Sequence, residues 1–157
     1  MIFTGHAELT IDDKGRLQIP SKHRAIWRPE RDGNAWYCVP WRKGLLMLFT
    51  EARFMSLAEK GPATLTPPAQ EGEAQANYFG LTERLELDSA GRVMIPRLHM
   101  GLTGLSRDVV VVGAGPRLEV WDKKAWADDL DARFRNLPDV MNALEKRGAG
   151  QGDAGRG

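Results

Sequence analysis

The chain contains the segment Leu9-Thr10-Ile11-Asp12-Asp13-Lys14-Gly15-Arg16-Leu17-Gln18-Ile19-Pro20, and 76 residues later it contains Leu85-Glu86-Leu87-Asp88-Ser89-Ala90-Gly91-Arg92-Val93-Met94-Ile95-Pro96. Asp, Gly, Arg, Ile and Pro recur at identical spacing, which can be written D-x-x-G-R-[LV]-x-I-P. The apolar positions on both sides of the Gly-Arg pair also recur in class. Two copies in register indicate an internal repeat rather than a chance similarity.

Each copy is predicted to form two short strands joined by a turn. The apolar residues alternate, which places them on one face of each strand. Gly15 and Gly91 can adopt a positive φ without a Cβ clash, as a tight hairpin requires. Asp12 and Asp88 can accept hydrogen bonds from amides just downstream, so we interpret all four residues as turn-bracing. Each copy is therefore expected to be a hairpin.

An arginine follows each turn and is expected beside the hairpin tip, Arg16 in the first copy and Arg92 in the second. A guanidinium offers planar, bidentate donors to phosphate or to guanine, and a hairpin tip can reach into a groove of DNA. Lys14, at the first tip, is predicted to be a third contact, whereas its counterpart is Ala90, so the two halves should not bind equally well. A structural alternative remains open, in which each arginine pairs with the aspartate of its own turn.

Positive charge is concentrated just after each motif. Lys14–Arg31 has a balance of +5 and Ala90–Arg107 has +3, whereas the whole chain has only +1. Such clustering is typical of a phosphate-binding face.

A short helix is predicted after the proline that ends each motif, over Ser21–Trp27 and Arg97–Leu102, because proline suits the first turn of a helix. Lys22, Arg24 and Arg97 on these helices are possible contacts to the DNA backbone. An ordinary solvated helix face is the alternative interpretation of these residues.

Two copies of this motif about half a chain apart resemble the MraZ family of bacterial transcriptional regulators, within the wider AbrB-like group. The resemblance extends from Phe3 to about Leu130 and includes the segment Gly113–Asp122 as a further family-like feature. It implies an α+β fold, in which two tandem AbrB-like swapped-hairpin repeats form one pseudo-dimeric, β-barrel-like domain with peripheral helices.

The resemblance also implies a sequence-specific DNA-binding regulator that is cytoplasmic and associated with the nucleoid. Relatives assemble into closed rings, so a homo-oligomer that binds direct repeats in double-stranded DNA is expected. By the same resemblance, this regulator would repress the division and cell wall gene cluster that includes its own promoter. One alternative is an AbrB-type antitoxin that binds DNA and a toxin, and another is an architectural ring protein without sequence preference.

We predict four segments along the chain. They are a first repeat at 1–60, a connector at 61–76, a second repeat at 77–135 and a flexible C-terminal tail at 136–157. Pro138 is expected to interrupt the last helix, and the five glycines in 148–157 predict disorder there.

The remaining elements follow from apolar runs and from turn and cap residues. The predictions are a first strand within 1–8, strands over 35–40 and 45–49, a polar loop over 28–34, a helix N-cap at Thr50, a short helix over 68–79, and strands over 109–112 and 118–121.

The composition argues against several other classes of protein. A single cysteine, Cys38, excludes an internal disulfide and a Cys-rich zinc site. No signal peptide and no apolar run of about 18 residues is visible, so a soluble, intracellular protein without membrane contact is expected. His23 and His99 occupy the same repeat position without recurring ligands around them, which favours packing over metal binding. We therefore expect no cofactor and no enzyme activity, although an enzyme that uses Cys38 with a histidine is conceivable.

Overall fold

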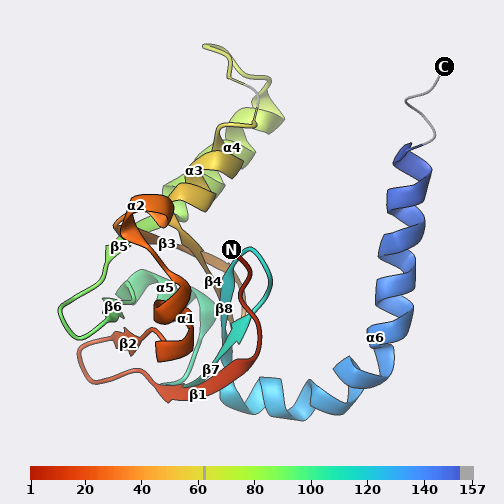
Figure 1. Ribbon diagram of the computed structural model, residues 1–157. Coiled ribbons are helices and arrows are strands. Elements are labelled where there is room, and N and C mark those ends of the chain that lie inside the picture. Colours follow the sequence, from red (N-terminus) through yellow and green to blue (C-terminus); the bar gives the residue numbers. More distant parts are fainter. Residues whose placement is uncertain (62, 153–157) are drawn as a thin grey trace. The chain divides into compact units, whose positions relative to one another are not determined.

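The computed structural model describes residues 1–61 and 63–152 (Figure 1). The chain divides into two compact units, Met1–Lys123 and Lys124–Gly157. The strands are β1 His6–Thr10, β2 Arg16–Gln18, β3 Ala35–Arg42, β4 Leu45–Thr50, β5 Glu83–Glu86, β6 Arg92–Met94, β7 Asp108–Gly113 and β8 Leu118–Asp122. The helices are α1 Ser21–Ile26, α2 Pro29–Asp32, α3 Glu51–Ala58, α4 Ala69–Leu81, α5 Arg97–Thr103 and α6 Lys123–Gly152.

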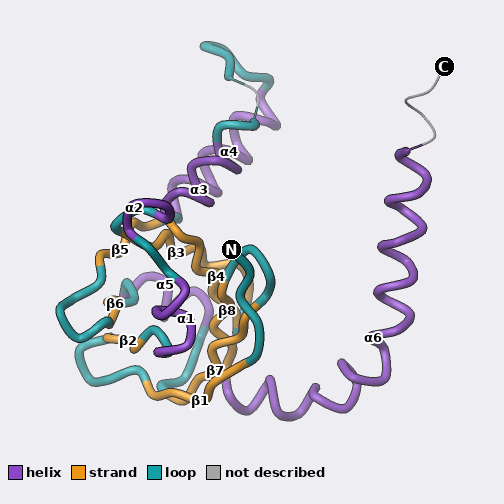
Figure 2. The backbone as a smooth tube through the Cα atoms, in the orientation of Figure 1, coloured by secondary structure: helices purple, strands orange, loops and turns teal. Residues whose placement is uncertain are grey.

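The main sheet combines strands from both repeats. Within the described residues it has six antiparallel strands in the order β1-β7-β8-β4-β3-β5 (Figure 2). The central pairing of β4 with β8 joins the two repeats, with Leu46 opposite Val120. The outer strands cross over, because β1 of the first repeat pairs with β7 and β5 of the second repeat pairs with β3. Each repeat thus contributes its first strand to the other repeat.

The second sheet is a short ladder between the two copies of the motif. β2 pairs with β6 in antiparallel register, with Arg16 opposite Met94, Leu17 opposite Val93 and Gln18 opposite Arg92. The ladder is continued by backbone bonds beyond both strands, from the Ile19 amide to the Gly91 carbonyl at 3.0 Å and from the Ile95 amide to the Gly15 carbonyl at 2.8 Å. The two motifs therefore stabilise each other through backbone hydrogen bonds.

These pairings correct two predictions while agreeing with the α+β class. The strands that flank each turn were expected to form a hairpin, but β1 pairs with β7 and β2 pairs with β6. A barrel-like sheet was also expected, but the main sheet is open, with β1 and β5 at its edges in the described part of the chain. Alternating apolar residues fix which face of a strand is buried, but not which strand it pairs with.

The core is built from the predicted apolar positions of the motifs. Leu17, Ile19 and Val93 are each 0% exposed, and Ile95 is 2% exposed. They belong to one cluster with residues of β3, β4, β7 and β8, including the fully buried Trp36. Burial of each such side chain contributes about 1.5–3 kcal/mol relative to exposure. The motif therefore has one face in the core and the other available to solvent.

Most of the other predicted elements are confirmed. The helices after Pro20 and Pro96, the helix over 68–79 and the strands predicted over 35–40, 45–49, 109–112 and 118–121 are present within two residues of their predicted bounds. The first strand, predicted within 1–8, instead begins at His6 and ends at Thr10. Thr50 caps α3, because its hydroxyl accepts a hydrogen bond from the Arg53 amide at 3.4 Å. The predicted polar loop over 28–34 instead contains the short helix α2.

The predicted interruption of the last helix is wrong. α6 continues through Pro138 as far as Gly152, so residues 148–152 are helical where disorder was predicted. Proline removes one backbone hydrogen bond and can bend a helix without ending it. The end of the predicted disordered segment, 153–157, lies outside the described residues. The structure contains no helix in its described part that is long and apolar enough to span a membrane.

The N-terminal segment is held against the turn between β7 and β8. Phe3 and Gly115 exchange backbone hydrogen bonds of 2.8 and 3.0 Å, and the Gly113 amide donates to the Gly5 carbonyl at 2.7 Å. A Cβ atom at Gly113 would lie 2.4 Å from the Thr4 amide nitrogen and 2.6 Å from the Phe3 carbonyl carbon. Both are backbone atoms, so the contact cannot be relieved by a side-chain rotation.

We therefore expect Gly113→Ala to lower the free energy of unfolding by about 1–3 kcal/mol, as overpacking does. Gly101→Ala is the matched control, because nothing lies within 4 Å of an added Cβ there. Gly101 lies within α5, so this control should be neutral or stabilising by up to about 1 kcal/mol. Urea titration of both variants measures the difference, and equal midpoints would contradict the proposed backbone contact.

Candidate nucleic-acid interface

The first turn is organised by the carboxylate of Asp12. Its Oδ1 accepts hydrogen bonds from the amides of Lys14 at 3.0 Å and Arg16 at 2.9 Å. Its Oδ2 accepts from the Arg16 guanidinium Nε at 2.6 Å. Gly15 has a φ of 81°, a conformation that favours glycine. The bond from the Arg16 amide, first among several donors, lowers the pKa of Asp12 below its ordinary value.

The second turn repeats this arrangement. Asp88 Oδ1 accepts from the amides of Ala90 and Arg92, both at 2.9 Å, and Asp88 Oδ2 accepts from Arg92 Nε at 2.8 Å. Gly91 has a φ of 77°. The Arg92 amide is again the largest cause of a lowered pKa, here that of Asp88. In both turns, one aspartate fixes the backbone and also orients the arginine that follows.

Arg16 and Arg92 share the outer face of the β2-β6 ladder. Leu17 and Val93 lie between them in register and point into the core, so the residues on either side of Leu17 and Val93 point outward. Diagonal neighbours on one face of an antiparallel pair are about 7–8 Å apart, which sets the spacing of the Cα atoms of the two arginines. In Figure 1 the loops that precede β2 and β6 extend to the same side of the view.

Both guanidinium groups are partly accessible. The exposed fraction of the side chain is 29% for Arg16 and 32% for Arg92, and each ion pair with its aspartate uses Nε. Within the described residues, neither guanidinium makes another hydrogen bond through its terminal nitrogens. The two roles left open by the sequence, ion pairing and ligand contact, are thus geometrically compatible. Lys14 is exposed at the first turn.

The basic residues of the two short helices differ in their surroundings. Lys22 Nζ donates to the His6 carbonyl at 3.0 Å, and Arg24 Nε donates to the Ile19 carbonyl at 2.9 Å. Arg97 is exposed and lines a hollow of about 600 Å³ beside the first turn, together with Lys14. Arg97 therefore lies beside the first motif although it belongs to the second in sequence.

Arg107 was not among the predicted site residues, yet it lines the same hollow. Its Nε donates to the Ile11 carbonyl at 3.1 Å, and its Nη2 is paired with Asp13. The Ile11 amide also donates to the Arg107 carbonyl at 2.8 Å. The only sequence signal was its membership of the second basic window, because its position beside the first turn depends on long-range pairing.

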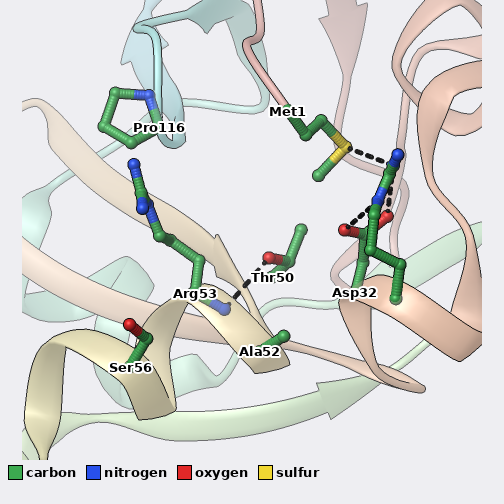
Figure 3. A pocket seen from close by; sticks show the side chains of 8 residues that line it. Met1, Asp32, Thr50, Ala52, Arg53, Ser56 and Pro116 are labelled. Carbon is green, nitrogen blue, oxygen red and sulfur yellow. Dashed lines mark hydrogen bonds and ion pairs between the residues drawn. The ribbon is translucent and has the colours of Figure 1, made fainter.

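A hollow of about 230 Å³ lies near α2 and the start of α3 (Figure 3). Its lining residues are Met1, Arg31, Asp32, Thr50, Ala52, Arg53, Ser56 and Pro116. The buried Asp32 carboxylate accepts from the Arg28 amide at 2.7 Å and from Arg31 Nη2 at 2.8 Å. The Arg31 bond is the largest cause of the lowered pKa of Asp32. This carboxylate is thus already paired, and no lining residue belongs to the repeated motifs.

The two histidines are buried and make ring and backbone contacts, which agrees with the expected structural role. His99 Nε2 donates to the Leu81 carbonyl at 2.6 Å, because a carbonyl can only accept. Its Nδ1 is then the acceptor for the Cys38 thiol at 3.2 Å. The ring of His23 packs edge-on against Phe3, with centroids 5.4 Å apart.

This geometry does not favour an enzyme that uses Cys38 with a histidine. Cys38 is 0% exposed, so no substrate can reach its sulfur. Burial also raises the pKa of its thiol well above the ordinary value, so the group stays protonated. The described residues contain no group of histidine, cysteine or acidic side chains that could hold a metal ion.

The fold and the paired turns define an α+β protein with a duplicated arginine-bearing turn. Comparison with known proteins identifies its family. A family model described as "MraZ protein, putative antitoxin-like" matches residues 78–138. A relative from Ralstonia pickettii (strain 12J) is 32% identical over 141 residues, covering 89% of this chain and 96% of the relative.

Two further relatives agree with this match. A protein from Methylobacillus flagellatus is 31% identical over 148 residues, covering 91% of this chain and 99% of the relative. A protein from Photorhabdus laumondii is 28% identical over 135 residues, covering 83% of this chain and 89% of the relative. All three relatives are named Transcriptional regulator MraZ. The chain belongs to the MraZ family, as the two motifs indicated.

Stability should fall as the pH is lowered through the histidine range. Burial is the largest cause of a pKa below 6.5 for both His23 and His99. Between the folded pKa values and 6.5, the unfolded chain binds more protons than the folded one. Stability is therefore complete above pH 6.5 and is lost as the pH falls through the folded pKa values, with a slope of up to about 1.4 kcal/mol per pH unit for each histidine.

Urea midpoints measured between pH 7.5 and 5 test this expectation. The variant His99→Gln should reduce the slope of stability against pH, while its side-chain amide keeps a donor for the Leu81 carbonyl. The carboxylates of Asp12, Asp32 and Asp88 do not contribute to the change in stability over this pH interval, since their pKa values lie below 3.8. A flat profile over this interval would be inconsistent with neutral, buried imidazoles.

Proposed function

We propose that this chain is a DNA-binding regulator of transcription and that Lys14, Arg16 and Arg92 contact the DNA. The observation that carries the proposal is the shared outer face of the β2-β6 ladder, on which both arginines lie. The names of the relatives, Transcriptional regulator MraZ, support the same function.

The ladder has a suitable size and chemistry for a groove of DNA. The major groove is about 12 Å wide and admits a two-stranded β-ribbon. Arginine can donate two parallel hydrogen bonds to guanine or to a phosphate. The aspartate of each turn holds Nε, which leaves the two terminal nitrogens of Arg16 and Arg92 to face the ligand.

The surrounding cations are suited to sequence-independent contacts. Lys22, Arg24 and Arg97 are assigned to the DNA backbone, and Arg107 is added to them because it lies in the same hollow as Lys14 and Arg97. Contacts to phosphate position a protein on the duplex, whereas contacts to base edges specify the sequence. Asp12, Gly15, Asp88 and Gly91 act indirectly by holding the turns.

We further propose that copies of the chain assemble into a closed ring on direct repeats of double-stranded DNA. Each chain then presents two turns, and linked weak contacts are made at high effective concentration. Exposed apolar side chains support association between copies, among them Leu57 and Phe79 in the first unit and Phe134 and Leu137 on α6. The natural site would be the promoter of the division and cell wall gene cluster that includes its own gene. A protein that represses this promoter would act in the cytoplasm, on the nucleoid.

An antitoxin is the second candidate, since the matching family model is described as antitoxin-like. In that case a toxin should co-purify with the chain when the two genes are expressed together. The doubled motif within one chain argues against this candidate, because most antitoxins of this group carry one motif and dimerise.

Arg16→Ala and Arg92→Ala should each weaken binding to a labelled duplex from the region upstream of the protein's own gene. Removing one charge-assisted contact per chain costs about 1.5–3 kcal/mol, or roughly 10-fold to 150-fold in Kd. Arg84→Ala is the matched control, because Arg84 is also half-exposed and paired, with Glu51 at 2.9 Å and Glu86 at 2.7 Å, but lies on β5. Fluorescence anisotropy measures Kd, and size-exclusion chromatography should show unchanged assembly. Undiminished affinity in the double arginine variant would refute the proposed role.

Affinity should also fall steeply with salt, because bound cations release counterions from the duplex. The slope of log K against log[salt] should decrease by about 1 for each phosphate-contacting residue removed. A duplex of scrambled sequence should retain the salt slope but bind more weakly. Equal affinity for both duplexes would favour an architectural protein without sequence preference.

A further inference from the structure

The two turns have the same internal hydrogen bonds but different external support. In each turn the aspartate accepts two amides and one guanidinium nitrogen at closely similar distances. Across the ladder, Ile19 and Ile95 make equivalent backbone bonds to Gly91 and Gly15. Side chains of the opposite repeat are the clearest difference in the support of the two turns.

Gln18 supplies such a difference at the second turn. Its side-chain amide Nε2 donates to the Ala90 carbonyl at 2.9 Å and to the Gly91 carbonyl at 3.1 Å. Both acceptors precede Arg92 directly in the chain. Gln18 also lies opposite Arg92 in the ladder, on the same outer face. One side chain from the first repeat therefore ties the turn that presents the arginine of the second repeat.

Arg24 adds to this support. An added Cβ at Gly91 would lie 2.6 Å from Arg24 Nη1, which shows that the guanidinium is packed directly over the second turn. Gly91 is accordingly buried. The Arg24 side chain is held in place by its bond to the Ile19 carbonyl.

The first turn lacks both supports. Met94 stands at the repeat position of Gln18 and cannot donate a hydrogen bond; it is 57% exposed. Met100 stands at the repeat position of Arg24. An added Cβ at Gly15 would meet only the Ile95 carbonyl oxygen, at 3.3 Å. The first turn thus carries the extra charge of Lys14 and is tied to the second repeat by a different side chain, Arg107, which donates to the Ile11 carbonyl and pairs with Asp13.

We propose that Gln18 is a positioning residue that clamps the second turn, so that Arg92 is presented to DNA in a fixed geometry. This inference rests on the proposed DNA-binding function. It predicts that loss of the Gln18 amide weakens binding through Arg92 and not through Arg16. A preformed contact loses less conformational entropy on binding, so the clamp should increase affinity.

Hydrogen exchange of the free, full-length protein tests the clamp without DNA. In Gln18→Met, amide exchange of peptides covering 88–92 should be about fivefold faster, as expected for the loss of about one net hydrogen bond. Peptides covering 12–16 are the internal control and should be unchanged. Met94→Gln is the reciprocal variant and should slow exchange in 12–16 by a similar factor. Unchanged exchange of 88–92 in Gln18→Met would overturn the proposal.

A double-mutant cycle then tests the link to DNA, again with the labelled upstream duplex. Gln18→Met should raise Kd about 3-fold to 10-fold alone, should have little further effect in Arg92→Ala, and should retain its full effect in Arg16→Ala. If Gln18 instead contacted DNA itself, its effect would add to that of Arg92→Ala and the free protein would show no change in exchange. That outcome would overturn the positioning role.

The two hypotheses fail in different ways. If the Arg16 and Arg92 variants bind DNA as well as the parent chain, the proposed role of the two arginines fails, although the effect of Gln18→Met on exchange at 88–92 would persist. If those variants lose affinity but Gln18→Met binds normally despite faster exchange at 88–92, the proposed function stands and the positioning role of Gln18 is refuted.

Discussion

The antiparallel pairing of β2 with β6 is the constraint on which the rest of the structure depends. Each strand has only three residues and comes from a different repeat. A lone copy of about 75 residues would have a marginal core, and a three-residue strand without a partner would leave its backbone groups unpaired. Joining the copies buries Leu17 and Val93 completely and satisfies the backbone around both turns. The duplication is therefore a structural requirement as well as a doubling of the surface.

This pairing also explains how one motif can serve stability and recognition. Residues alternate between the two faces of a strand, so the inward positions supply the core while the outward positions carry Arg16 and Arg92. The aspartate of each turn accepts two backbone amides and then uses its second oxygen to orient the arginine. The same carboxylate thus fixes the local backbone and limits the motion of the group that faces the ligand.

The repeats are alike where the backbone is constrained and differ where side chains face outward. Glycine, aspartate and the buried apolar residues recur because turn geometry and core packing leave few alternatives. Outward positions are free of these demands, so Lys14 is matched by Ala90, and Gln18 by Met94. A chain with two copies can thereby present two different surfaces on the same backbone conformation, which a symmetric dimer of identical chains cannot do.

Local chemistry in the sequence determined the repeat, both turns, the buried face of each motif, the short helices after Pro20 and Pro96, and the family. Tertiary structure decided the strand partners, and with them the open sheet, the place of Arg107 beside the first turn and the support of Gly91 by Arg24. The continuation of α6 through Pro138 was likewise seen only in the structure. The physical reason is that alternation and turn residues act over a few neighbours, whereas partner choice depends on the total burial and hydrogen bonding of segments that are distant in sequence.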